Sequence, residues 1–258
     1  MRRRERGENE RGFLNLENVD AVVLCGGLGK RLRSVTGDNP KVMAAVEGRP
    51  FLDVLMEYLA RQGFKRVILC TGYQADQIEA YYRQNTHGLR FEFSREEEPL
   101  GTGGAVRNAR CLIQSSPFVV LNGDSFCAVN YRALGEFHQS RKALASVVVS
   151  KAEDHRDYGG IVLDETGRIV RFLEKNNPVL SGGKKTADEV SCVNAGIYCF
   201  NDEIFSFMPK ARTFSLEYDF FPGLVRHLFF GFLVEEAFLD IGTPERYQQA
   251  LAKMKRPV

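Results

Sequence analysis

The sequence lacks the features that would place the protein in a membrane or on a nucleic acid. Its 258 residues contain no apolar run near the ~20 residues that a membrane span needs. Basic residues exceed acidic ones by only two, and a net charge of +2 gives no argument for a nucleic-acid partner. The charged start also lacks the apolar core of a signal peptide. We expect no membrane or nucleic-acid partner, a charged extension over 1–18, and a single domain over 19–258.

The chain also lacks the usual patterns of thiol and histidine chemistry. Its six cysteines include no C-x-x-C pair and lie mostly in apolar runs, which predicts buried free thiols in a reducing compartment, the cytoplasm. The four histidines pair with nothing obvious, and no Ser/His/Asp or Cys/His arrangement emerges. The sequence therefore gives no sign of a side-chain nucleophile.

Short apolar runs alternate with helical patterns through the first 141 residues. Runs such as "VILC" and "FVVL" are apolar throughout, as strands buried on both faces should be. This alternation predicts an α/β fold with a parallel central sheet and helices on both faces. The expected strands cover 21–25, 66–72, 90–94 and 118–124, and the expected helices cover 51–64, 75–85, 103–113 and 131–141.

The second half of the chain predicts a smaller, β-rich part. The expected strands cover 144–150, 193–200 and 232–242, with a hairpin over 159–175. Gly167 lies in the turn of this hairpin, where a positive φ is needed. A last helix should follow Thr243, with that residue as its N-cap and Pro244 in its first turn.

A glycine-rich stretch with two cations, "LCGGLGKRL" at 24–32, follows the first strand. Backbone N–H groups of Gly26 to Gly29 can surround a phosphate, and Arg31 offers a planar fork to its oxygens. The stretch is not a Walker loop, and it fails the dinucleotide fingerprint at Leu32. An ordinary turn with solvated cations is the alternative.

Two carboxylates stand near the ends of expected strands. Asp124 closes "NGD" and Asp240 lies in "FLDIG". Ligands of open α/β sheets gather at the carboxyl edge, and two converging carboxylates suit Mg²⁺. Taken singly, each aspartate could equally be a turn residue or a helix cap.

Residues 24–43, "LCGGLGKRLRSVTGDNPKVM", resemble the signature of the sugar-phosphate nucleotidyltransferases. The resemblance runs from about residue 19 through the rest of the chain, and further matching segments follow in the same order: "EEPLGTGGA", "LNGDS", "FLEK", "NAGIY" and "LDIGTPERY". It implies a Rossmann-like, glycosyltransferase-A-like fold. It also implies an enzyme that joins an NTP to a sugar 1-phosphate and releases pyrophosphate.

The resemblance implies roles for individual residues. The implied catalytic residues are Arg31, Lys41 and Lys175, and the implied Mg²⁺ ligands are Asp124 and Asp240. The implied nucleotide-binding residues are Leu24, Gly26, Gly27, Gly29, Lys30, Gly101, Thr102, Gly103, Asn122 and Gly123. The implied sugar-phosphate-binding residues are Gly159, Glu174, Lys175 and Asn194. From the residues alone, Thr102 as an N-cap and Glu174 with Lys175 as a surface ion pair remain open.

Within this family, the combination of segments most resembles the D-glycero-α-D-manno-heptose 1-phosphate guanylyltransferases. That implies GTP as the nucleotide and a carboxylate or carbonyl near the guanine, for which Glu96, Glu97 and Glu98 are candidates. Mannose 1-phosphate guanylyltransferases and short uridylyl- or thymidylyltransferases share most of the segments. A non-catalytic, nucleotide-sugar-binding regulatory subunit is a further alternative.

Two positions depart from the family pattern, and one property stays open. Lys30 replaces the usual threonine, and Val42 stands where proline often follows the lysine. Relatives often form dimers or larger assemblies, so a homo-oligomer is an open expectation.

Overall fold

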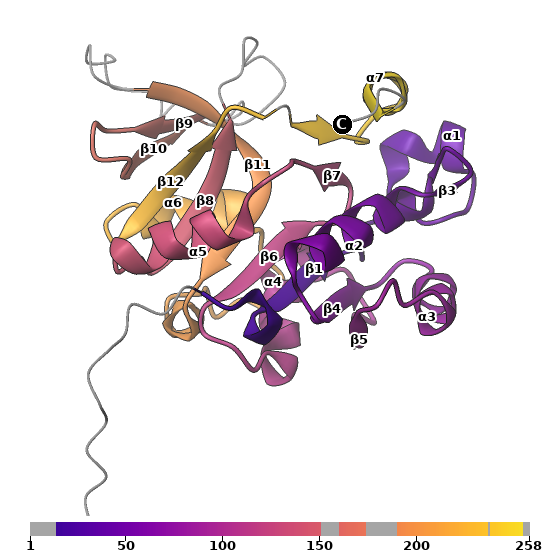
Figure 1. Ribbon diagram of the computed structural model, residues 1–258, viewed down its shortest axis with the longest axis horizontal. Helices are drawn as coiled ribbons and strands as arrows, with labels where there is room; N and C mark the ends of the chain where they lie inside the picture. The colour runs from indigo at the N-terminus through magenta and orange to yellow at the C-terminus, as the bar shows by residue number, and fades with distance from the viewer. Residues whose placement is uncertain (1–13, 151–159, 174–189, 237, 255–258) are drawn as a thin grey trace, which may run out of the picture.

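The computed structural model describes residues 14–150, 160–173, 190–236 and 238–254, and a nine-stranded mixed sheet runs through it. Figure 1 shows the sheet with helices on both faces, so the expected fold class is confirmed. The strands of this sheet are β1 (Asp20–Leu24), β4 (Arg66–Thr71), β5 (Arg90–Arg95), β6 (Phe118–Asn122), β8 (Ala145–Ser150), β9 (Gly160–Leu163), β10 (Ile169–Leu173), β11 (Val190–Phe200) and β12 (Phe229–Val234). The helices are α1 (Arg33–Thr36), α2 (Phe51–Gln62), α3 (Ala75–Gln84), α4 (Gly101–Asn108), α5 (Tyr131–Ser140), α6 (Phe221–Leu224) and α7 (Pro244–Met254).

The first four strands form a parallel block in the order β6-β1-β4-β5. Alternate residues of β1 enter different cores: Ala21 and Val23 pack with α2, α3 and α5, whereas Val22 packs with α4 and α6. Both faces of this block are therefore buried, which is why its sequence reads as unbroken apolar runs. Burying one such side chain fully contributes about 1.5–3 kcal/mol.

The C-terminal half attaches to this block through one long antiparallel strand, β11. β11 pairs with β6 on one side, and β8 and β9 follow it with antiparallel pairing. The β9–β10 pair is the expected hairpin, and Gly167 has a φ of +81° in its turn. The pairing of β11 with β8 shifts register between Asn194 and Tyr198, and a β-bulge of this kind re-aims side chains.

Two expected elements end differently in the structure. The strand expected over 232–242 divides into β12 and a separate two-residue strand, β13 (Leu239–Asp240). It divides because the chain leaves β8 and crosses to pair with β7 (Ser125–Phe126). The helix expected over 103–113 begins earlier, at Gly101, and tightens into the 3₁₀ helix η4 (Ala109–Leu112).

The last helix, α7, packs against the segment that follows the glycine-rich loop. Tyr247 and Ala250 of α7 share a small core with Leu32, Phe51 and Ile241. The Tyr247 hydroxyl also donates to the carbonyl oxygen of Ala45, in the short hairpin of β2 (Ala45–Val46) and β3 (Arg49–Pro50). This packing holds β13 beside the segment that follows the glycine-rich loop.

The six cysteines are free thiols, and five of them are buried, as expected. Among the described residues, no helix is both long and apolar enough to cross a membrane.

Candidate active site

The glycine-rich loop connects β1 to the 3₁₀ helix η2 (Lys30–Leu32), and it forms one wall of a cavity. Gly29 has a φ of +58°, and a Cβ there would lie 2.9 Å from the Lys41 Cβ. A larger residue would be strained and would push Lys41 away. A Cβ on Gly27 would meet no atom within 4 Å, so its backbone is open to a ligand.

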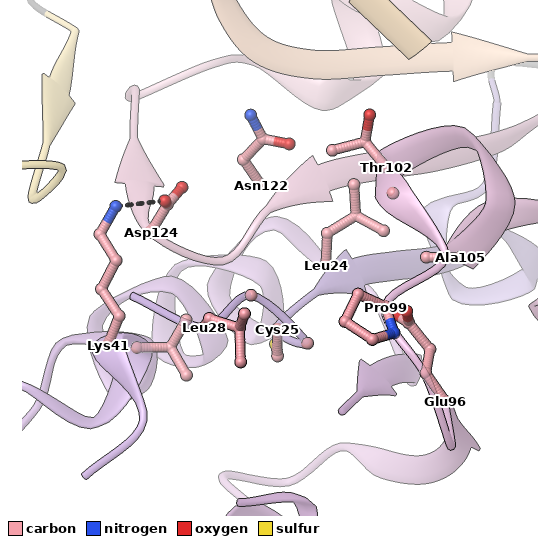
Figure 2. A pocket seen from close by; sticks show the side chains of 14 residues that line it. Leu24, Cys25, Leu28, Lys41, Glu96, Pro99, Thr102, Ala105, Asn122 and Asp124 are labelled. Carbon is pink, nitrogen blue, oxygen red and sulfur yellow. Dashed lines mark hydrogen bonds and ion pairs between the residues drawn. The ribbon is translucent and has the colours of Figure 1, made fainter. Parts of the chain in front are cut away.

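The cavity encloses about 330 Å³ at the carboxyl edge of the parallel block. Figure 2 shows Lys41 and Asp124 on one side of it, Glu96 and Pro99 on the other, and Thr102 with Asn122 above Leu24. Its lining residues are Leu24, Cys25, Gly26, Gly27, Leu28, Lys41, Val42, Glu96, Pro99, Gly101, Thr102, Ala105, Asn122 and Asp124. The fold thus gathers most of the predicted nucleotide-binding residues around one space.

Lys41 and Asp124 form an ion pair across the cavity wall. Lys41 Nζ lies 2.5 Å from Asp124 Oδ2, and the two side chains are 12% and 37% exposed. The 3₁₀ helix η3 (Lys41–Met43) fixes the lysine backbone, because the amide of Ala44 bonds to its carbonyl oxygen at 3.1 Å. Val42 is buried, so the absence of proline after Lys41 does not loosen this segment.

Asp240 lies beside Asp124 because β13 pairs with β7. Asp240 is opposite Ser125 in this pair, and the Ile241 amide donates to the Asp124 carbonyl oxygen at 3.0 Å. The Asp240 carboxylate accepts from Gly242 N at 2.6 Å and from Arg246 Nη1 at 3.0 Å. The backbone of Asp240 therefore lies beside that of Asp124 at the sheet edge, although Asp240 does not line the cavity.

This pair fits a hard divalent cation by its chemistry. In the structure each carboxylate is neutralised by a cation, Asp124 by Lys41 and Asp240 by Arg246, so the acidic pair requires countercharge. Carboxylate oxygens are the ligands that Mg²⁺ prefers, with water or phosphate oxygens completing the shell. Within the described ranges, no group of three or more His, Cys, Asp or Glu side chains could hold a metal ion.

Glu96 is the one of the three candidate glutamates that lines this cavity. Its Oε2 accepts from Leu100 N at 2.7 Å, and its Oε1 lies 2.7 Å from where a Gly26 Cβ would be. Burial raises the pKa of Glu96, although the Leu100 hydrogen bond opposes the shift. Glu96, Glu97 and Glu98 also line an adjoining space of about 200 Å³ behind Gly26. The cavity therefore extends toward a carboxylate held in a fixed direction.

Thr102 is not the N-cap of α4. The N-cap is Leu100, and Thr102 lies inside the helix with its hydroxyl directed at Glu217 Oε2, 2.7 Å away. Gly101 lines the cavity, whereas a Cβ on Gly103 would lie 2.2 Å from the Phe214 ring. The structure therefore accounts for Gly103 by packing.

Several predicted residues lie near the cavity without lining it. Lys30 and Arg31 are exposed on η2, outside the cavity wall. Gly123 allows β1 and β6 to approach, because a Cβ there would lie 2.8 Å from the Leu24 carbonyl oxygen. Asn194 lies on β11, where it donates to the Tyr198 hydroxyl at 3.0 Å. Gly159, Glu174 and Lys175 lie outside the described residues.

The cavity offers no activated thiol. Cys25 lines it, but burial raises the pKa of the thiol well above its usual value. A protonated thiol is a weak nucleophile. The groups that can act here are cations, carboxylates and backbone amides.

Sequence reasoning missed three residues that hold this site in place: Tyr198, Glu217 and Arg246. Glu217 lies in "FSLEYDFFP", where Ser215 before a helical turn could have indicated an N-cap. The side chain of Ser215 does cap the π-helix η7 (Leu216–Phe220). No local signal indicates that Glu217 contacts Thr102, 115 residues away.

Comparisons with known proteins place the chain in one family. The family model described as "Nucleotidyl transferase" matches residues 20–256. The D-glycero-alpha-D-manno-heptose 1-phosphate guanylyltransferase of Aneurinibacillus thermoaerophilus is 36% identical over 92% of this chain and 99% of its own. The mannose-1-phosphate guanylyltransferase of Mycobacterium tuberculosis is 34% identical over 93% of this chain and 66% of its own.

A solved structure matches over the same extent. HddC from Yersinia pseudotuberculosis superposes with a TM-score of 0.78 and is 35% identical, covering 92% of this chain and 99% of HddC. HddC has also been solved in complex with GMP-PN, with the same scores.

Proposed function

Because this chain belongs to the nucleotidyl transferase family, we propose that it transfers GMP from GTP to D-glycero-α-D-manno-heptose 1-phosphate, forming a GDP-sugar and pyrophosphate. One observation carries the proposal: the open glycine backbone, the Lys41–Asp124 pair and the Glu96 carboxylate surround a single cavity. Such a space suits a nucleotide whose phosphates lie at one end and whose base lies at the other.

The choice of guanine rests on Glu96. A guanine edge presents an N1–H and an exocyclic amine, both donors, and a carboxylate accepts from both. The Leu100 amide fixes one oxygen of Glu96, so the group has little freedom to turn away. Guanylyltransferases among the similar proteins support the same base.

The choice of a heptose rests on the similar proteins. The D-glycero-alpha-D-manno-heptose 1-phosphate guanylyltransferases of Aneurinibacillus thermoaerophilus and Campylobacter jejuni are 36% and 33% identical to this chain, and the mannose-1-phosphate guanylyltransferase of Mycobacterium tuberculosis is 34% identical. Both sugars are therefore compared in the test below.

The chemistry that these residues support is an in-line displacement. An oxygen of the sugar phosphate attacks the α-phosphorus, a P–O bond forms, and the bond to the bridging oxygen breaks with its electron pair leaving on pyrophosphate. A phosphate monoester has a second pKa near ~6, so the nucleophile is already mostly dianionic at neutral pH. No general base is needed, and catalysis depends on positioning and charge neutralisation.

Lys41 is the residue best placed to neutralise charge. Its ammonium group lies in the cavity wall beside Asp124, and its side chain starts next to Gly29 of the glycine-rich loop. A cation there can contribute on the order of 3–4 kcal/mol to transition-state stabilisation, by analogy with one oxyanion donor. Arg31, exposed on the turn after the loop, would approach the departing pyrophosphate from outside.

We further propose Mg²⁺ as the cofactor, held by Asp124 and Asp240. When bound, it would supply positive charge to the phosphate oxygens of both substrates. Lys175, Glu174, Gly159 and Asn194 are proposed to hold the sugar phosphate, as the family resemblance implies.

The test is pyrophosphate release over a matrix of NTPs and sugar 1-phosphates with Mg²⁺. We expect release with GTP and the manno-heptose 1-phosphate, and none from the Asp124→Asn variant as the matched control. Faster turnover of mannose 1-phosphate would favour a mannose enzyme. A preference for UTP or dTTP would overturn the role of Glu96, and no release with any pair would indicate a binding protein.

A further inference from the structure

Glu217 accepts hydrogen bonds from residues on both sides of the site. Its Oε2 accepts from Thr102 Oγ1 and Ser215 Oγ, each at 2.7 Å, and its Oε1 accepts from the Tyr198 hydroxyl at 3.0 Å. Thr102 lines the nucleotide cavity, and Tyr198 lies on β11 next to Asn194 on the sugar side. One carboxylate therefore joins three segments that are far apart in the chain.

The direction of each hydrogen bond follows from the donors available. A carboxylate only accepts, so Tyr198 must donate its single hydroxyl hydrogen to Glu217. The Tyr198 oxygen can then accept from Asn194 Nδ2, which lies 3.0 Å away. The amide oxygen of Asn194 accepts from Gly196 N at 2.8 Å, so the contacts of both amide atoms support the same orientation of the side chain.

The same reasoning holds on the nucleotide side. Thr102 Oγ1 accepts from the Leu216 amide at 2.8 Å, which leaves its own hydrogen for Glu217. A hydroxyl fixed in this way presents a defined surface to the cavity. Thr102 and Asn194 therefore take their orientations from one acceptor.

The bulge in β11 ties this network to the sheet edge. Gly196 has a φ of +70°, and a Cβ there would lie 2.7 Å from Asn122 Nδ2. Asn122 lines the cavity just before Asp124. Asn122 therefore packs against the bulge whose Gly196 amide holds Asn194, and the network reaches a residue two positions before Asp124.

We propose that Glu217 is a positioning residue that sets the hydrogen-bond direction of Thr102 on the nucleotide side and of Asn194, through Tyr198, on the sugar side. It couples the two substrate sites without contacting either substrate. The π-helix that carries it fits this role, since π-helical turns are often found at functional sites. The inference rests on the proposed function, because it assigns Asn194 to the sugar phosphate.

Replacing Glu217 with glutamine keeps the shape of the side chain but changes the direction of its hydrogen bonds. In either orientation of the amide, its NH₂ group faces a hydroxyl that needs an acceptor, Tyr198 on one side or Thr102 and Ser215 on the other. Two single-branch variants each remove one hydroxyl that donates to Glu217. Tyr198→Phe removes the hydrogen bond on the sugar side, and Thr102→Val removes the one on the nucleotide side. Thr102→Ser keeps the hydroxyl, and Glu203→Gln, an exposed carboxylate on η6 (Asp202–Ser206), is the matched surface control.

The experiment measures KM for each substrate, kcat and the thermal midpoint of these five single variants and of the Glu217→Gln/Tyr198→Phe double variant, beside the wild type. We expect Tyr198→Phe to raise KM for the sugar 1-phosphate about ten-fold with KM for GTP unchanged, and Thr102→Val to do the reverse. Glu217→Gln should raise both, and adding Tyr198→Phe to it should have less than the additive effect on the sugar constant. Glu203→Gln should stay within about two-fold of the wild type, and Thr102→Ser, which keeps the hydroxyl, should raise KM for GTP less than Thr102→Val does.

Two results would overturn the inference. One is a Glu217→Gln enzyme whose constants lie within two-fold of the wild type; the other is a fall in thermal midpoint with both KM values unchanged, which indicates a purely structural role. If Glu217→Gln does not fold, the opposite effects of the two single-branch variants still decide the question. A wild type without turnover counts against the proposed function instead.

Discussion

Each edge of the parallel block carries a carboxylate–cation pair, but the two pairs serve different purposes. At the amino edge, Asp20 and Arg66 open β1 and β4 as register partners, and their charged atoms lie 2.6 Å apart. At the carboxyl edge, Asp124 pairs with Lys41 in the wall of the cavity. Both are acid–base pairs between segments far apart in the chain, yet one is sealed and the other is open.

The amino-edge pair is buried, and hydrogen bonds satisfy all of its charged atoms except Arg66 Nε, which has no partner in the part of the chain that the structure describes. Asp20 is 5% exposed and also accepts from the backbone amides of Gln114 and Ser115, at 2.5 and 3.0 Å, while Arg66 donates to the Leu112 carbonyl oxygen at 2.6 Å. Asp124 is 37% exposed, and among the described residues its carboxylate has a hydrogen bond to Lys41 alone. A carboxylate with a structural role, such as Asp20, has several hydrogen-bond donors within the protein. A carboxylate with a functional role, such as Asp124, has fewer and can still bind a ligand.

The largest effect should come from Asp124→Asn. The change keeps the shape of the side chain but removes the charge that Lys41 faces, so we expect at least a 10⁴-fold loss of turnover, about 5 kcal/mol of barrier. The unfolding free energy should stay near that of the wild type, because the pair is partly solvated. Pyrophosphate release and urea denaturation measure the two quantities. Turnover within ten-fold of the wild type would refute the assignment of this edge.

The next effect should come from Asp20→Ala, and on stability instead. Removing one partner leaves Arg66 buried without its counter-charge, which costs about 3–5 kcal/mol. Urea unfolding should show this loss, while kcat of the folded fraction should remain within two-fold. A double variant, Asp20→Asn with Arg66→Met, should recover part of the loss because no uncompensated charge stays buried. An Asp20→Ala protein that is stable but inactive would reverse the comparison.

A buried histidine allows a test of the comparison by pH. His138 is 1% exposed on α5, with Nδ1 2.9 Å from Ser146 Oγ, and burial lowers its pKa from 6.5 to about 4. The unfolded chain therefore takes up the proton first as the pH falls. The stability that the neutral ring provides is complete above about pH 6.5 and is lost as the pH falls toward about 4.

This linkage predicts a loss of about 2 kcal/mol in unfolding free energy between pH 7 and pH 5 that His138 alone contributes. Urea titrations of the wild type and of His138→Phe at both pH values isolate it, since the variant should lack that share. The effect should fall on stability, as at the amino edge, and not on KM. An equal pH dependence in the two proteins would show that His138 titrates normally.

The sequence predicts the carboxyl edge with its cavity better than the amino edge with its buried ion pair. Strand ends followed by glycines or aspartate are local signals, and they placed Gly27, Asn122 and Asp124 around one space. The Asp20–Arg66 pair has no such signal, because it depends on which strands become neighbours and in what register.

The same limit explains what was missed on the sugar side. The sequence predicts that 193–200 is a strand, but not that β11 runs antiparallel beside β6 or that it bulges at Gly196. The expected strand 232–242 was wrong because its two halves pair with different partners, β8 and β7. Thr102 looked like a cap because capping is local, whereas its contact with Glu217 forms only when the chain is folded.

The smallest effect should come from an ion pair that lies at the carboxyl edge but is exposed to solvent. It tests whether function depends on position at this edge or on enclosure in the cavity. Arg95 ends β5 and pairs with Asp76 in α3, so it belongs to the carboxyl side of the sheet, but Asp76 is 89% exposed and Arg95 48%. If position at this edge decided function, Asp76→Asn should impair turnover as Asp124→Asn does. If the surroundings decide, solvent screens this pair, and neither kcat/KM nor the urea midpoint should change measurably. Steady-state kinetics and denaturation in low and high salt decide between these two explanations. A salt-sensitive loss of activity in Asp76→Asn would mean that the electrostatic field of the whole edge, rather than the enclosed cavity, attracts the polyanionic substrates.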